Sequence, residues 1–132
     1  MSIAFCIGPV KETYPPFTES DLKIDPEDYK QKLITRWKGI TFYESPATDE
    51  PLLWSLPADK PGAAGALASL LDNMQSICSG YDPHLAEFAI WHRSVIPGKY
   101  QLYMRVIRTE EALELTAETT IEDIYSFFAS YL

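Results

Sequence analysis

The sequence is poor in the residues that serve most metal sites, many catalytic sites and disulfide-rich miniproteins. Its 132 residues include only two cysteines and two histidines. Two cysteines cannot build a disulfide framework, and the spacing of Cys6 and Cys78 resembles no metal motif. We therefore expect two free thiols in a reducing compartment, and no metal or other cofactor.

Long apolar runs and a basic leader segment are also missing. A membrane-spanning helix needs about 18 consecutive apolar residues, and the sequence contains no such run. The opening residues, MSIAFCIGPV, lack both a basic segment and an apolar run long enough for export. These two absences predict a cytoplasmic protein that does not enter the membrane.

Positive charge is scarce. Eleven Lys and Arg residues stand against nineteen Asp and Glu residues, which gives a net charge of −8. Nucleic acids and anionic membranes attract clustered positive charge, so neither is an expected partner. The imbalance is strongest in residues 109–132, which contain six acidic side chains and no basic one. A basic protein partner fits this charge balance.

The residues that are present suffice for a folded core. Hydrophobic side chains make up 46% of the chain and aromatic ones 13%, which is too apolar for an intrinsically disordered protein. A chain of this length fits one domain. We therefore expect a single α+β domain over residues 1–132, in which residues 1–20 are irregular or strand-like.

Capping signals and apolar spacing predict three amphipathic helices. The first begins after a capping residue, Asp25, and stops at Gly39. The second covers roughly residues 63–79, where apolar side chains repeat at helical intervals. The third begins at Thr119, and Glu122 three residues later would complete a capping box.

Strands are predicted for residues 40–44 and 52–56, for a hairpin over residues 88–106, and for residues 112–116. These strands follow one another through turns, without helical crossovers between parallel strands. The expected fold class is therefore α+β: a mainly antiparallel sheet of about five strands, with the three helices packed mainly on one face.

The turn at Pro97-Gly98 allows two registers for the predicted hairpin. A two-residue turn gives one register, but Pro-Gly prefers a turn type that splays the strands. An odd-numbered turn gives the other register, which collects the apolar side chains of both strands on one face. Burial favours this second register, and its extension to residues 112–116 pairs Met104 with Leu115 and Arg105 with Glu114. It buries Met104 and points His92 at the core, so we expect the histidine to be structural.

The opposite face of the predicted hairpin is the candidate binding site. It would carry Trp91, Arg93, Tyr103 and Arg105. Cation–π and cross-strand charge pairs would explain these residues as an ordinary sheet surface. The same residue types dominate the hot spots of protein interfaces, so the alternative is contact with a partner or with a second copy of the chain.

Signals for catalysis or ligand binding are weaker. His84 could be oriented by Asp82, and Glu87 is close in sequence, so these three residues mark one alternative pocket. The segment Gly62–Gly65 precedes a predicted helix and resembles half of a phosphate cradle, but it lacks the lysine of a P-loop. Cys78 falls on the buried stripe of the predicted second helix, where a thiol is usually inert.

The function that the sequence favours is protein binding without catalytic chemistry. An inhibitor, an immunity-type protein or an adaptor for a basic protein partner would have this composition. The alternative is a small-molecule-binding protein or an enzyme that uses one of the two weaker sites. An exposed aromatic patch would support the first interpretation, and a deep pocket with convergent polar groups the second.

Overall fold

Seven strands and three helices form the structure, a computed structural model that describes residues 4–9, 21–44, 51–57, 67–71, 75–80, 85–107, 109 and 111–131. In chain order the elements are β1 (Ala4–Gly8), α1 (Pro26–Arg36), β2 (Thr41–Tyr43), β3 (Leu52–Ser55), β4 (Leu67–Leu70), β5 (Ile77–Gly80), α2 (Leu85–Val95), β6 (Leu102–Val106), β7 (Ala112–Leu115) and α3 (Ile121–Ala129). The predicted α+β class is confirmed, although the sheet has more strands than the five expected.

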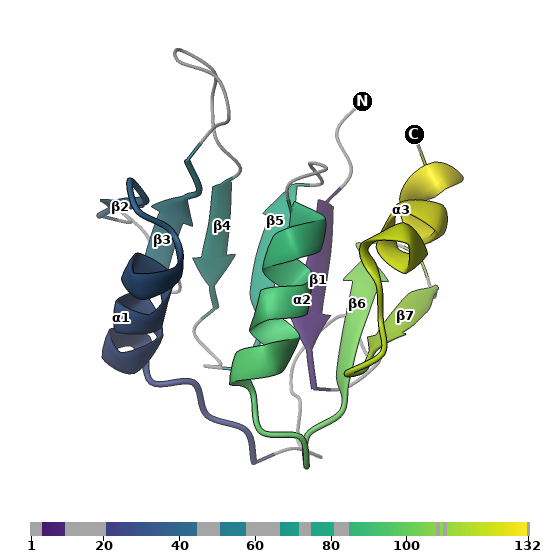
Figure 1. The fold of residues 1–132 in the computed structure, drawn as a ribbon, viewed down its shortest axis with the longest axis horizontal. Helices are drawn as coiled ribbons and strands as arrows, with labels where there is room; N and C mark the ends of the chain where they lie inside the picture. Colours follow the sequence, from purple (N-terminus) through teal and green to yellow (C-terminus); the bar gives the residue numbers. More distant parts are fainter. Residues whose placement is uncertain are drawn as a thin grey trace.

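All neighbouring strands are antiparallel, in the order β2-β3-β4-β5-β1-β6-β7. The three helices lie side by side over one face of the sheet, with α2 between α1 and α3 (Figure 1). Because β5 and β6 both pair with β1, the β5-α2-β6 connection crosses over β1. The expectation that strands follow one another without a helical crossover is therefore wrong at this point.

Alternating burial along the central strands defines the core. Phe5 and Ile7 of β1 and Leu102 and Met104 of β6 are fully buried under the helices. Tyr103 and the other intervening residues of β6 are only half-buried, as period-two alternation requires. The predicted burial of Leu102, Met104 and Val106 is confirmed.

The register between β6 and β7 differs from the prediction by two residues. The predicted partner of Met104 is Leu115 and that of Arg105 is Glu114, whereas the structure pairs Met104 with Leu113 and Arg105 with Ala112. A shift of two residues leaves every side chain on its predicted face. The faces were therefore predicted correctly although the pairs were not.

The first helix is confirmed, with its caps. The Asp25 carboxylate accepts a hydrogen bond of 3.1 Å from the Glu27 backbone N–H, and α1 begins with Pro26. The helix ends at Arg36, and Gly39 then adopts a positive φ of 88° that favours glycine. Two neighbouring strands, β2 and β3, also lie where the sequence predicts them.

The predicted helix over residues 63–79 is wrong. Its described part forms the strands β4 and β5, which pair with each other and with their neighbours β3 and β1. Short apolar runs fit helical and strand spacing equally well, and here sheet pairing with distant residues decides between them. Residues 63–66 lie outside the described residues.

The predicted hairpin over residues 88–106 is also wrong in its first half. Residues 85–95 form the helix α2, and only residues 102–106 form a strand. Leu85, Phe88, Ala89 and His92 recur at helical intervals and are all fully buried. The apolar residues whose alternation suggested a strand therefore lie on one face of a helix.

The third helix begins one residue later than predicted. Thr120 is the capping residue, and its hydroxyl accepts a hydrogen bond from the Asp123 backbone N–H at 3.2 Å. The Asp123 carboxylate accepts in turn from the Thr120 backbone N–H at 2.9 Å. A capping box exists as expected, but Thr120 and Asp123 form it instead of Thr119 and Glu122.

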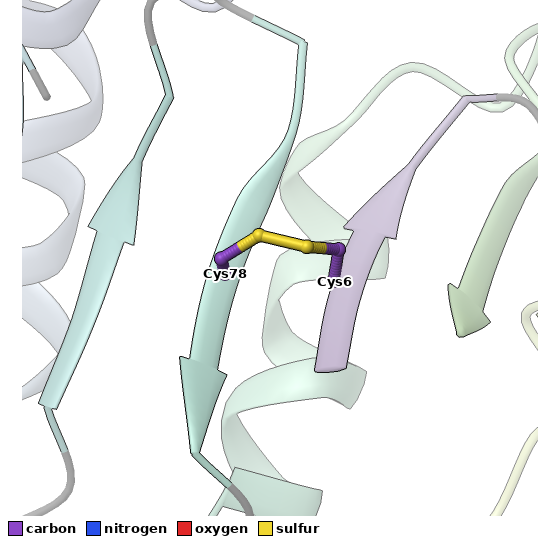
Figure 2. The surroundings of a disulfide bond; sticks show 2 residues. All are labelled: Cys6 and Cys78. Atoms are coloured by element: carbon purple, nitrogen blue, oxygen red, sulfur yellow. A yellow bond between two sulfur atoms is a disulfide. The ribbon is translucent and has the colours of Figure 1, made fainter. Parts of the chain in front are cut away.

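The expectation of two free thiols is wrong. Cys6 of β1 and Cys78 of β5 face each other across neighbouring strands and form a disulfide (Figure 2). Their Cα atoms are 4.2 Å apart, and both residues lie half-buried on the face of the sheet that the helices do not cover. The bond joins positions 72 residues apart in the chain, which sequence spacing alone does not bring together.

Candidate functional site

A surface groove of about 470 Å³ lies between α1 and α2. This α1/α2 groove is lined by four residues of α1 and two of α2: Gln31, Lys32, Thr35, Arg36, Trp91 and Val95. Its volume falls in the range of grooves and pockets that bind small ligands or single large side chains. Its walls combine an apolar aromatic surface with two positive charges.

Trp91 forms the fixed wall of the α1/α2 groove. Its indole is half-buried and packs edge-on against the rings of Tyr29 and Trp37, with centroids 5.5 and 5.0 Å away. Phe88 lies 5.8 Å away. Because these contacts fix its orientation, a ligand that binds here does not have to order the side chain.

Two cationic side chains border the groove from successive turns of α1. Lys32 pairs with Asp28 at 2.9 Å, and both side chains are about half exposed. The Arg36 guanidinium lies over the ring of Trp37, 4.6 Å from its centroid. Residues 29–40, which include this part of α1, contain four basic residues and no acidic one. Sequence reasoning did not single out Lys32 or Arg36 as site residues, although their i, i+4 spacing was visible.

His92 lies beneath the groove, in the core. Its ring is fully buried, and its Nδ1 atom shares a hydrogen bond of 2.7 Å with the hydroxyl of Tyr29. Burial, with a smaller contribution from the Arg93 charge, lowers the pKa of His92 to about 3. The ring is therefore neutral at physiological pH. The predicted core position of His92 is confirmed.

The four predicted binding residues do not share one face. Trp91 and Arg93 lie on α2, on the helix-covered side of the sheet, whereas Tyr103 and Arg105 point from β6 to the other side. The expected hairpin surface therefore does not exist, because its first strand is a helix. Of the four residues, Trp91 lines the groove. A role of these side chains in binding a partner stays a prediction.

The two arginines of this set hold local structure. Arg93 donates hydrogen bonds to the carbonyl oxygens of Ile96, Pro97 and Tyr100, at 3.0, 2.9 and 2.7 Å, and so fixes the turn that follows α2. Arg105 donates from Nε and from a terminal nitrogen to the carbonyl oxygen of Thr109, at 3.1 and 2.8 Å. Both guanidinium groups thus compensate backbone carbonyls at chain reversals.

A second surface lies at the opposite end of the sheet, on β7, the turn that follows it and the first turn of α3. Five acidic side chains are exposed along this end: Glu111 just before β7, Glu114, Glu118, Glu122 and Asp123. We call this set the acidic surface. Glu114 pairs with Tyr103 and so points to the face without helices, whereas Glu122 and Asp123 lie on the helix side. Residues 111–131 contain no lysine, arginine or histidine. The acidic surface therefore has no basic side chain of its own segment to neutralise it.

An exposed aromatic residue adjoins the acidic surface. Tyr125 of α3 is 43% exposed. It follows Glu122 by three residues, so the two side chains lie on the same side of the helix. An aromatic ring beside carboxylates combines apolar area with negative charge.

The structure gives little support to the two alternative ligand sites. Glu87 is exposed on the first turn of α2. Asp82, His84 and the segment Gly62–Gly65 lie outside the described residues. Within the described part of the chain, no group of three or more His, Cys, Asp or Glu side chains could hold a metal ion. No helix of that part is both long enough and apolar enough to cross a membrane.

Comparison of the chain with protein-family models, curated proteins and solved structures finds no significant match.

Proposed function

We propose that this protein is a non-catalytic binding domain that recognises a basic protein partner through the acidic surface. An inhibitor, an immunity-type protein or an adaptor would act in this way. The observation that carries the proposal is the set of five exposed carboxylates between Glu111 and Asp123, in a segment without a single basic residue. Such a surface attracts and orients a positively charged partner.

The position of β7 adds a second reason. It is the last strand in the order of the sheet, and among the described strands it pairs only with β6. The outer edge of such a strand offers backbone groups to an extended segment of another protein. Charged residues also protect edge strands from aggregation. Charge reversal at this edge distinguishes recognition of a partner from protection against aggregation.

The immobilised protein should retain a basic protein from an extract of the cells that produce it. We expect moderate salt to release this protein, because the contact is largely electrostatic. The double variant Glu114→Lys/Glu118→Lys should lose it. The matched control Glu44→Lys/Glu87→Lys makes the same change in net charge at exposed positions elsewhere and should still retain it. Equal retention by both variants would contradict the proposal.

The compartment belongs to the same proposal. A cytoplasmic location stays a prediction from the sequence, and the Cys6–Cys78 bond argues against it, because disulfides persist mainly in oxidising compartments. Alkylation of free thiols in intact cells, followed by mass spectrometry of the protein, decides the question. A fully oxidised pair would favour an oxidising compartment, and a reduced pair the cytoplasm.

A further inference from the structure

The two surfaces of this molecule complement each other. The α1/α2 groove has an aromatic wall and two cationic side chains at its border. The exposed side of α3 has an aromatic ring and carboxylates. We propose that the α1/α2 groove binds the α3 helix of a second copy of this chain, so that two copies form a closed dimer through their helix layers.

The exposed side of α3 has the pattern of a helix that docks into a groove. Glu122, Tyr125, Ser126 and Ala129 are all exposed and follow the spacing i, i+3, i+4 and i+7. Tyr125 supplies one large anchor, and the two small residues let the helix approach closely. Recognition of a helix in an apolar groove uses this kind of spacing.

The charges at the two sites match. Glu122 lies one turn before Tyr125 on α3 and would face the cationic border formed by Lys32 and Arg36. The Lys32 ammonium already contacts Asp28, but it carries three donors and can bind a second carboxylate. The Arg36 guanidinium is held over Trp37 and offers a planar set of donors beside the groove. The ring of Tyr125 would pack against Trp91.

The arrangement of the helices allows this contact to occur twice. The helices α1 and α3 lie at opposite ends of one helix layer, with α2 between them (Figure 1). When two such layers face each other across a twofold axis parallel to the strands, α1 of each copy lies opposite α3 of the other. Both grooves are then filled, and the assembly closes at two copies without forming a chain.

The net charge of −8 opposes any association of identical copies. At physiological ionic strength this long-range repulsion is screened beyond about 8 Å, so contacts between neighbouring side chains dominate. We therefore expect a reversible dimer that forms at high protein concentration and in which the local charge pairs determine the affinity.

Sedimentation velocity of the full chain, from micromolar to near-millimolar concentration, tests the dimer. The wild type should convert from monomer to dimer without larger species. The double variant Lys32→Glu/Arg36→Glu should weaken dimerisation by at least about 10-fold, because like charges then face each other. The control Lys23→Glu/Lys38→Glu changes two exposed lysines outside the groove by the same charge and should dimerise like the wild type.

Charge reversal on the other side supplies the decisive comparison. On its own, Glu118→Lys/Glu122→Lys should also dimerise at least about 10-fold more weakly than the wild type. Mixed with Lys32→Glu/Arg36→Glu, it should form a heterodimer, since both contacts of the mixed pair then join opposite charges. Tyr125→Ser, at an exposed position, should weaken the wild-type dimer without changing the fold, which circular dichroism verifies for every variant.

A wild type that remains monomeric throughout would overturn the proposal, as would a dimer that both charge-reversed variants form unchanged. The dimer shares the acidic surface with the proposed function but does not depend on it. Lys32→Glu/Arg36→Glu should still retain a basic partner from extract while losing self-association. Absence of partner capture alone would therefore contradict the proposed function, whereas absence of the dimer alone would contradict the groove contact.

Discussion

The two ends of the helix layer place their polar groups differently. At the α1 end, a polar pair lies in the core, where His92 and Tyr29 share a hydrogen bond among aromatic rings. At the α3 end the core is apolar, with Phe128 packed on Phe5 at a centroid distance of 5.5 Å, and the charged groups lie outside. Protonation of the buried His92 should therefore destabilise the α1 end, whereas added salt should screen the exposed charges at the α3 end.

The largest expected effect concerns the bond between the two parts of the sheet. The Cys6–Cys78 disulfide links β5 to β1 in the middle of the sheet. The strands β4, β3 and β2 follow beyond β5 at the α1 end, and β6 and β7 follow beyond β1 at the α3 end. A closed loop of 72 residues restricts the unfolded chain, so its opening should lower the free energy of unfolding by about 4 kcal/mol.

Urea denaturation with and without dithiothreitol measures this difference. The double variant Cys6→Ser/Cys78→Ser should unfold like the reduced wild type and should not respond to the reductant. Identical denaturation midpoints for oxidised and reduced wild-type protein would show that the bond does not hold the two parts together.

The next effect is specific to the α1 end and depends on pH. Burial lowers the pKa of His92 from its ordinary value of 6.5 to about 3, so the folded ring stays neutral while the unfolded ring takes up a proton below pH 6.5. The stabilisation is complete above pH 6.5 and is lost as the pH falls toward 3. Between pH 8 and pH 5 this single group should lower the free energy of unfolding by about 2 kcal/mol.

Thermal or urea unfolding across this pH range tests the prediction, with His92→Phe as the control. The variant has no group at this position that titrates, so its stability should fall less steeply between pH 8 and pH 5 than that of the wild type. If stability depends on pH in the same way in the two proteins, groups other than His92 cause the acid sensitivity. The two ends would then not differ in this respect.

The smallest effect should be equal at both ends. Asp25 caps α1 and Thr120 caps α3, and both side chains are exposed. Alanine at either position should cost about 1 kcal/mol, since each removes a hydrogen bond to an otherwise unpaired backbone N–H. Thr35→Ala, which removes an exposed hydroxyl that donates to the Gln31 carbonyl oxygen in the last turn of α1, is the matched control and should change stability little.

Chemical denaturation of the three variants provides the measurement. A much larger loss for Thr120→Ala than for Asp25→Ala would mean that α3 depends on its cap more than α1 does. In that case the two ends would differ in local helix stability as well as in the nature of their cores.

Local signals in the sequence predicted the parts of the fold that depend on local interactions. The first helix was placed correctly because its cap, its first proline and its terminal glycine are all within the segment itself. Residues 63–79 and 85–95 were assigned wrongly because each short apolar run fits more than one period. Their actual structures are decided by pairing and packing with distant strands.

The site was predicted only in part, for the same reason. Trp91 was singled out by its residue type and does line a surface groove. The residues that complete the groove, among them Lys32 and Val95, come from two helices that are far apart in the sequence. The disulfide was missed because Cys6 and Cys78 become neighbours only when β1 lies beside β5. No spacing rule contains that information.

The central position of β1 also constrains the order in which the molecule can assemble. This strand precedes its two partners in the chain, yet it lies between β5 and β6. On the ribosome it must therefore remain unpaired until residues 77–80 emerge, and its second edge stays open until residues 102–106 follow. Contacts so distant in sequence slow folding and leave edges exposed to aggregation during synthesis. Oxidation of Cys6 and Cys78 before β6 emerges would hold the first of these pairings in register while the second is completed.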